Sequence, residues 1–219
     1  KRTATKKEVQ RLQNKFLNAD ELKSCLQQLK EINPRIGLAM EFIALTGLRC
    51  GELLALRVQD YYKDKSIINI NGTIIKSARN GEDTQRGTPK NSYSYRDVII
   101  NDRAKYILDS IILENKKLAS WNSKKYKDKG YIFTTSTGNP FNIQYINTKL
   151  RKIKLADKKI STHIFRHTHI SILSELGLPL KSIMQRVGHN DPKTTLSIYT
   201  HVTNNMNNEM KNKLKALSF

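Results

Sequence analysis

The hydrophobic pattern of this chain changes its period twice, and that change limits the fold more than any other feature of the sequence. Residues 66–100 carry β-branched and alternating segments, "SIINI", "GTIIKS" and "YSYRDVII", which are typical of strands. On either side of this region the pattern favours helices, with apolar residues recurring every three to four positions. The chain is therefore predicted to adopt an α+β fold, mostly α-helical with a small antiparallel β-sheet.

The ends of the predicted helices are set by capping residues and by glycine and proline breaks. We predict helices over residues 18–32, 34–46, 49–58, 103–120, 142–155, 162–176, 180–187, 192–200 and 204–216. The segment "YIFTT" is predicted to be a further short strand. The polar stretch "ARNGEDTQRGTPKN" is predicted to be the exposed end of a long hairpin.

The chain is predicted to hold one domain, residues 18–219, preceded by a basic linker remnant at residues 1–17. Because the sequence starts without a methionine, we expect it to be part of a longer protein. The last predicted helix and the residues after it present apolar side chains that need burial: Met206, Met210, Leu214, Leu217 and Phe219.

The composition is strongly basic, with 39 lysines and arginines against 19 acidic residues and a formal net charge of +20. The excess is spread over the whole chain, which is typical of a folded protein that binds a polyanion such as nucleic acid. A ribosome-associated or simply basic surface is the alternative. No apolar run is long enough to cross a membrane. Cys25 and Cys50 are predicted to be reduced core thiols of a cytosolic protein.

The stretch "STHIFRHTHISIL", residues 161–173, combines histidines and an arginine with helical apolar spacing. His163 lies three residues before Arg166 and four before His167, so the three side chains share a helix face. The opposite stripe is predicted to pack inward, and a structural His169 is predicted to turn toward it. This stripe consists of Phe165, Ile172 and Leu176.

The sequence gives little support to metal chemistry. It has no HExxH motif and no Cys/His ligand set, and its acidic residues are too scattered to predict a metal-dependent nuclease or transposase. Metal-free chemistry on a phosphate needs a nucleophile, fixed cations for the non-bridging oxygens and an acid for the leaving oxygen. Arginine suits the second role because its fork matches two phosphate oxygens.

Two further segments offer such groups. In "TGLRCGELLAL", Arg49 opens a helix after a Thr-Gly break, and Glu52 lies one turn on, where it can brace the arginine. The alternative is a surface arginine with an ordinary salt bridge. In "VGHNDPKTTLSIYTHV", His189 follows a glycine and Tyr199 lies near the end of the next helix. A helix-capping histidine and a core tyrosine are the alternatives there.

Taken in order, "TGLRCGEL", "HIFRHT", Gly-His and "TTLSIYTHV" resemble the motifs of the tyrosine recombinases, the integrases of phages and mobile elements. The resemblance runs from about Asp20 to Val202 and implies a tyrosine recombinase catalytic-domain fold. The catalytic roles below are those that the resemblance implies. The nucleophile, which would form a 3′-phosphotyrosine, is Tyr199; the clamps on the non-bridging oxygens are Arg49 and Arg166; the donor to the same phosphate is His189; and the base is His163.

The resemblance also implies a lysine acid on the β-hairpin that protonates the leaving 5′-oxygen. Lys90 is the best match because it precedes "YRDVII", and Lys76 is its competitor. Glu52 would support the site from beside the catalytic residues. From its own spacing, His167 is expected to be either a supporting residue or a solvated ring. Further DNA contacts are predicted for Arg79, Arg86 and Lys193.

By this resemblance the chain is expected to be a site-specific recombinase that integrates or excises a phage or other mobile element, in the bacterial cytoplasm. The expected partners are double-stranded DNA, other subunits in a tetramer, and excisionase or host DNA-bending factors, with no membrane. No cofactor, metal or ATP is expected. The helix at 204–216 packs either within its own chain or on a neighbouring subunit. A type IB topoisomerase and a non-catalytic DNA-binding protein are the competing functions.

Overall fold

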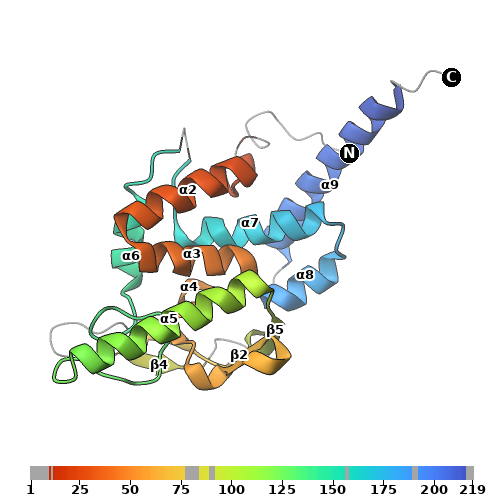
Figure 1. The fold of residues 1–219 in the computed structure, drawn as a ribbon. Helices are drawn as coiled ribbons and strands as arrows, with labels where there is room; N and C mark the ends of the chain where they lie inside the picture. Colours follow the sequence, from red (N-terminus) through yellow and green to blue (C-terminus); the bar gives the residue numbers. More distant parts are fainter. Residues whose placement is uncertain are drawn as a thin grey trace.

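The structure, a computed structural model, describes residue 10 and residues 12–76, 84–88, 92–155, 158–188 and 192–215. Within these residues a helical body lies over two small antiparallel sheets (Figure 1). The helices are α2 (Ala19–Ile32), α3 (Pro34–Thr46), α4 (Cys50–Ala55), α5 (Asp102–Trp121), α6 (Ile143–Leu150), α7 (Thr162–Glu175), α8 (Leu180–Val187) and α9 (Lys193–Lys215). The strands are β1 (Tyr61–Tyr62), β2 (Ile67–Ile70), β3 (Thr73–Lys76), β4 (Gln85–Gly87) and β5 (Arg96–Ile99). The predicted α+β class is confirmed.

The first helices begin and end where the sequence predicts. Asn18 caps α2 through a reciprocal pair, since its side chain accepts from Glu21 N and its backbone N–H donates to the Glu21 carboxylate, both at 2.9 Å. Asn33 caps α3 in front of Pro34. Gly47 ends α3 with φ of 72°, a left-handed conformation that favours glycine.

The strand region forms two sheets instead of the single predicted one. One sheet has the order β1-β2-β5, and the other pairs β3 with β4. In the first, Ile68 faces Val98 and both side chains are buried, whereas Asn69 and Asp97 point outward. The chain leaves this sheet at Gly72, where an added Cβ would collide with the Arg86 guanidinium, so the absence of a side chain allows the close approach of Arg86.

Two other predictions were wrong in detail. The segment 131–135 is not a strand: it makes only isolated bridges, and the Asn115 side chain donates to Ile132 O at 2.8 Å, where a strand partner would pair. The predicted helices 192–200 and 204–216 form the single helix α9. No glycine or proline interrupts this helix, and the Thr203 hydroxyl donates to Tyr199 O, one turn back, at 2.9 Å.

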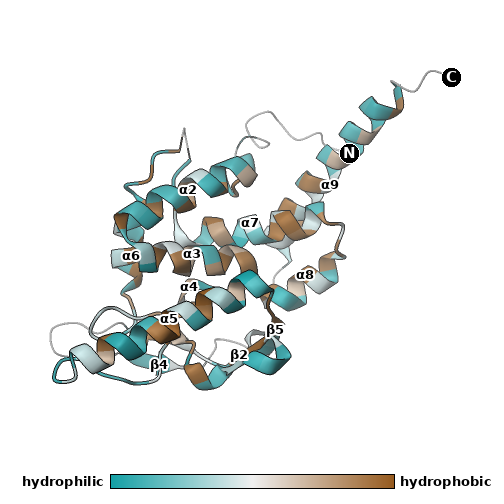
Figure 2. Ribbon diagram, in the orientation of Figure 1, coloured by the Kyte–Doolittle hydropathy of each residue, from teal (hydrophilic) through white to brown (hydrophobic). Residues whose placement is uncertain are grey.

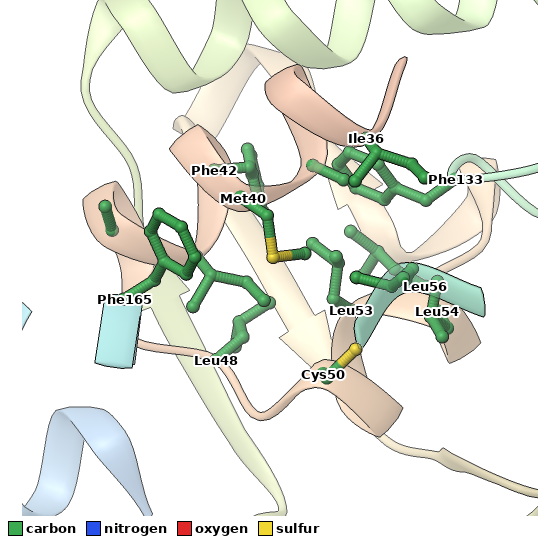
Figure 3. Close-up of a cluster of buried hydrophobic side chains, with 14 of the residues drawn as sticks. Ile36, Met40, Phe42, Leu48, Cys50, Leu53, Leu54, Leu56, Phe133 and Phe165 are labelled. Carbon is green, nitrogen blue, oxygen red and sulfur yellow. The ribbon is translucent and has the colours of Figure 1, made fainter. Parts of the chain in front are cut away.

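The core has two parts, and α7 contacts both. The larger cluster lies among α2, α3, α4, α5, α6 and the sheets, and Figure 3 shows its centre around Ile36, Met40, Phe42, Leu48, Cys50, Leu53, Leu54, Leu56, Phe133 and Phe165. The second cluster consists of Ile170, Ile183, Val187, Ile198 and Val202. Figure 2 shows hydrophobic residues gathered on α3 and where α7 meets α9. The helix α7 is thus held rigidly between the two clusters.

The inward face of α7 differs from the predicted stripe. Phe165 is buried as predicted, but Ile172 is only half-buried and Leu176 is 69% exposed. The helix ends at Glu175, so Leu176 lies beyond its last turn. Arg166, predicted to share the exposed face, is only 2% exposed and lies on the buried side.

The residues just before α2 pack onto the domain. Leu17, the last residue of the predicted linker, is buried, and its N–H donates to the Thr168 hydroxyl at 2.9 Å. Lys158 Nζ donates to Phe16 O at 2.9 Å. These contacts fix the start of α2 beside α7.

Candidate active site

Three arginines from separate segments converge on the carboxyl end of α8. Each donates to one of three consecutive carbonyl groups: Arg96 Nε to Arg186 O at 2.7 Å, Arg166 Nη2 to Val187 O at 2.5 Å, and Arg49 Nη2 to Gly188 O at 2.7 Å. The last carbonyls of a helix lack partners within it and carry the negative end of its dipole, which favours cations there. The backbone thus gathers a concentrated positive charge in one place.

Arg166 is the most deeply buried member of this cluster. Its Nη1 also donates to Gly47 O at 2.5 Å, which ties α7 to the end of α3. Burial, followed by the charge of Arg49, lowers the pKa of Arg166 to about 9. The guanidinium therefore stays protonated at neutral pH.

Arg49 stands at the N-cap of α4, more open to solvent, with a side chain that is 34% exposed. Its Nη1 lies 2.7 Å from Glu52 Oε1, and its backbone N–H donates to Glu52 Oε2 at 2.9 Å. The predicted contact between the two residues is present. Glu52 thereby holds the guanidinium from one side, and Gly188 O holds it from the other.

Glu52 is a buried carboxylate at the centre of the cluster. Burial alone would raise the pKa of its carboxyl group, but the charge and hydrogen bonds of Arg96, assisted by Arg166 and Arg49, outweigh burial and lower it. Glu52 is therefore ionised at neutral pH.

His163 lies on the first turn of α7 and is exposed, one turn before Arg166. Partial desolvation of its ring lowers its pKa, and the charges of Arg166 and Arg49 lower it further. The neutral imidazole, the form that can accept a proton, therefore predominates at pH 7.

The ring of His167 lies next to that of His163, since the ring centroids are 6.4 Å apart with an angle of 30° between the planes. Its Nδ1 lies 3.2 Å from Lys15 O. Burial is the main cause that lowers the pKa of His167 to about 4. A neutral ring that donates from Nδ1 to this carbonyl fits these surroundings.

His169 is structural, as predicted. Its Nδ1 lies 2.8 Å from Ala44 O, and its Nε2 accepts from Arg186 Nε at 3.0 Å. Burial, followed by the charge of Arg186, lowers the pKa of His169 to about 3, so the ring is neutral. It links α7 to the ends of α3 and α8.

Tyr199 lies on α9, which packs against α7 and α8, and its ring contacts the second hydrophobic cluster. Among the described residues, its hydroxyl makes no hydrogen bond to Arg49, His163 or Arg166. The structure therefore brings the two predicted clamps and His163 together, whereas the predicted nucleophile lies on a separate helix that packs against α7 and α8.

Three predicted site residues, Lys90, His189 and Arg79, lie outside the described residues. Lys76, the competitor of Lys90, is an exposed residue at the end of β3.

Arg86 and Lys193, both predicted to contact DNA, have different settings. The Arg86 guanidinium bonds to Ala55 O at 3.2 Å and to the Asn71 side chain, and lies 3.9 Å from Asp60 Oδ2. It fastens β4 to the domain. Lys193 is exposed on the first turn of α9. The DNA contacts of both residues stay predictions.

Arg96 and Arg186 were missed from the sequence. Arg186 Nη1 donates to Ile99 O at 3.0 Å in addition to its bond to His169, and Arg96 bonds to Glu52. For Arg96 the only sequence signal was its place as a charged residue in the alternating strand "YRDVII". The partners of Arg96 come from segments far away in the chain.

Metal ligation and membrane spanning can both be checked over the described residues. Among the described residues, no three His, Cys, Asp or Glu side chains lie close enough together to hold a metal ion. None of the described helices is both long and apolar enough to span a membrane.

The sequence profile of the phage integrase family matches residues 15–206. The integrase of Staphylococcus phage L54a is 46% identical over 184 residues, which are 83% of this chain and 52% of that protein. The prophage ps2 integrase of Lactococcus lactis subsp. lactis is 40% identical over 214 residues, 94% of this chain and 56% of that protein. The chain thus spans about half the length of these curated relatives.

A similar fold occurs in the integrase of transposon Tn1549, solved in complex with transposon right-end DNA. The TM-score is 0.69 at 20% sequence identity, covering 92% of this chain and 66% of the other. At this identity the likeness concerns the fold.

Proposed function

The chain belongs to the phage integrase family, and on this premise we propose that it is the catalytic part of a site-specific DNA recombinase, which integrates or excises a mobile element. The observation that carries the proposal is the convergence of Arg49 and Arg166 on the end of α8, beside an exposed neutral His163. Two fixed guanidinium groups with a base alongside supply part of what metal-free phosphoryl transfer requires.

In the proposed reaction the Tyr199 hydroxyl oxygen attacks the phosphorus of a DNA phosphodiester, and His163 accepts the hydroxyl proton. The new bond joins the tyrosine oxygen to the 3′-phosphate, and the bond from phosphorus to the 5′-oxygen breaks. Lys90 protonates the departing 5′-oxygen. The 5′-hydroxyl of another strand then attacks the phosphotyrosine and reverses these steps, so no high-energy cofactor is consumed.

Arg49 and Arg166 stabilise the negative charge that develops on the non-bridging oxygens. Each guanidinium has five N–H groups, and Arg166 donates two of them to Gly47 O and Val187 O. These bonds fix the fork and leave further donors for a phosphate. His189 directly follows Gly188, whose carbonyl Arg49 holds, and it donates to the same phosphate.

Tyr199 must reach this phosphate from its place on the second cluster. We expect DNA binding to bring α9 closer to the arginines. The tyrosine ring is half-buried, so the movement exchanges part of its packing for contact with the phosphate.

A multimer on double-stranded DNA completes the proposal, with four subunits and with excisionase or DNA-bending proteins as further partners. The far end of α9 extends beyond the domain and exposes Met206, Met210 and Leu214 at four-residue intervals (Figure 1). An apolar groove of about 800 Å³ between α2 and α7 includes Leu22 and Leu26. Exchange of the α9 end into the groove of a second subunit would bury both surfaces.

The test of the function is covalent capture of DNA. The 219-residue chain is incubated with a pool of nicked duplexes that carry a randomised core, and the duplexes still attached to protein in SDS are sequenced. We expect selected sequences joined through a 3′-phosphate, and no capture by the Tyr199→Phe variant. Capture that persists in Tyr199→Phe would refute the assignment, and failure of the wild-type chain to capture any duplex would refute the function.

A second readout separates strand exchange from relaxation. Supercoiled plasmid without a selected site should stay supercoiled, whereas two selected duplexes should exchange strands. Relaxation of any plasmid without exchange would indicate a topoisomerase instead.

A further inference from the structure

Glu52 is shared between two arginines. Oε1 accepts from Arg49 Nη1 at 2.7 Å and from Arg96 Nη1 at 3.4 Å, while Oε2 accepts from the Arg49 backbone N–H at 2.9 Å and from Arg96 Nη2 at 3.0 Å. The Arg49 side chain is 34% exposed, whereas Arg96 is 8% exposed. Arg49 can therefore reach a ligand, whereas Arg96 binds Glu52 from the buried side. Arg49, Glu52 and Arg96 together form one charged set.

The charges of this set decide what Arg49 can offer a phosphate. Two guanidinium groups and one carboxylate leave a net charge of +1, and Arg166 adds to it. Without Arg96, Glu52 would be paired with Arg49 alone, and the two charges would cancel. In a poorly solvated site such cancellation weakens the attraction for an anion strongly.

Arg96 also fixes the geometry around Arg49. Its Nε donates to Arg186 O at 2.7 Å, and its Nη1 donates to Ser94 O at 2.9 Å. A Cβ added at Gly188 would lie 2.8 Å from Arg96 Nη1, so the backbone at Gly188 rests against the guanidinium. The carbonyl that holds Arg49 is thus placed by Arg96.

We propose that Arg96 is a positioning residue of the active site, which offsets the charge of Glu52 and places the end of α8, so that Arg49 presents a net positive charge to the scissile phosphate. The inference rests on the proposed function. It assigns no contact between Arg96 and DNA.

The experiment compares Arg96→Met with a matched control, Arg103→Met. Arg103 makes a similar two-bond pair with Glu41, at 2.6 and 3.0 Å, and among the described contacts neither residue shares a hydrogen bond with Glu52 or with the three clustered arginines. The readout is single-turnover cleavage of a selected nicked duplex by the 219-residue chain, over a range of DNA concentrations. We expect Arg96→Met to slow cleavage about 100-fold at saturating DNA, with half-saturation changed less than about threefold. Arg103→Met should cleave like the wild-type chain.

A rescue variant separates charge compensation from a general loss of structure. In Arg96→Met/Glu52→Gln the carboxylate that cancels the charge of Arg49 is gone, so the pair formed by residues 49 and 52 regains a net positive charge. We expect this double variant to cleave about 10-fold faster than Arg96→Met alone. The inference would be overturned if Arg96→Met cleaved as fast as the wild type, or if the double variant cleaved more slowly than Arg96→Met. Either result leaves the proposed function standing, as long as DNA is still captured through Tyr199.

If the wild-type chain captures no duplex, the proposed function fails and a second measurement still decides the inference. Inorganic phosphate is titrated into the same variants, and the Nε–H NMR signals of Arg49 and Arg166 are followed. We expect phosphate affinity to fall about 10-fold in Arg96→Met and to recover in the double variant. Equal affinity in wild type and Arg96→Met would contradict the role of Arg96.

Discussion

Replacing Glu52 with glutamine removes the only negative charge that the described contacts place between Arg49 and Arg96. The carboxylate is 3% exposed, and the partner Arg96 is 8% exposed, so water cannot replace the lost charge. Removing one member of a buried ion pair costs about 3–5 kcal/mol. The amide keeps one acceptor oxygen in a similar place, so we expect Glu52→Gln to lower the free energy of unfolding by roughly 3 kcal/mol at pH 7.

The ion pairs of Glu52 also predict how the difference in unfolding free energy between the wild type and Glu52→Gln depends on pH. The pKa of Glu52 is lowered in the folded chain, so its contribution to stability is fully present above the unfolded value of about 4.3. It is lost as the pH falls through the lower folded pKa, because the wild-type carboxylate is then protonated. Glutamine does not titrate, so Glu52→Gln loses no stability in this way. The difference in unfolding free energy between the wild type and Glu52→Gln should therefore shrink in acid.

The assay is urea unfolding followed by circular dichroism, between about pH 7 and pH 3.5. Glu41→Gln is the matched control, because Glu41 pairs with Lys30 at 2.8 Å and Arg103 at 2.6 Å, and both partners are exposed. The control should lose about 1 kcal/mol or less. A Glu52→Gln loss no larger than that of the control, or one that stays constant into acid, would refute the reasoning.

Three further predictions concern the backbone, the proposed base and a thiol. Gly47→Ala should lower the free energy of unfolding by roughly 3 kcal/mol, because φ is 72° and the new Cβ would lie 2.5 Å from the His169 ring. Gly177→Ala, with φ of 77° and nothing within 4 Å, should lose only about 1 kcal/mol, and equal losses in thermal unfolding would contradict the account. If His163 is the base, as proposed, the single-turnover cleavage rate should fall in acid with a midpoint below 6.5, because the pKa of His163 is lowered. A midpoint at or above 6.5 would exclude that assignment. Burial raises the pKa of Cys50 to about 12, so this thiol should resist alkylation near pH 8 until urea unfolds the chain, and fast labelling of the native protein would contradict its burial.

The sequence predicted best those features that depend on neighbouring residues. The caps at Asn18 and Asn33 and the left-handed end at Gly47 each act within one turn of a helix. The contact of Arg49 with Glu52 has the spacing of one helical turn and was predicted for the same reason. The continuity of α9 was missed because threonine and asparagine favour a helix only weakly.

The features that the sequence did not predict depend on contacts between distant segments. Arg96 reaches Glu52 across 44 residues and Arg186 across 90. Periodicity assigns a charged residue to the solvent face, so it placed Arg166 outside, whereas the carbonyls of Gly47 and Val187 hold it in the interior. Buried arginines satisfied by backbone carbonyls follow from the tertiary fold, and no local pattern reports them.

The most direct test of the proposed active site is a crystal structure of Tyr199→Phe bound to a selected duplex. We expect one phosphate within hydrogen-bond distance, about 3.2 Å, of both the Arg49 and Arg166 guanidinium groups, with His163 and the ring at position 199 beside it. Two guanidinium groups that contact different phosphates would contradict it, as would a ring at position 199 that remains on the second hydrophobic cluster when the duplex is bound.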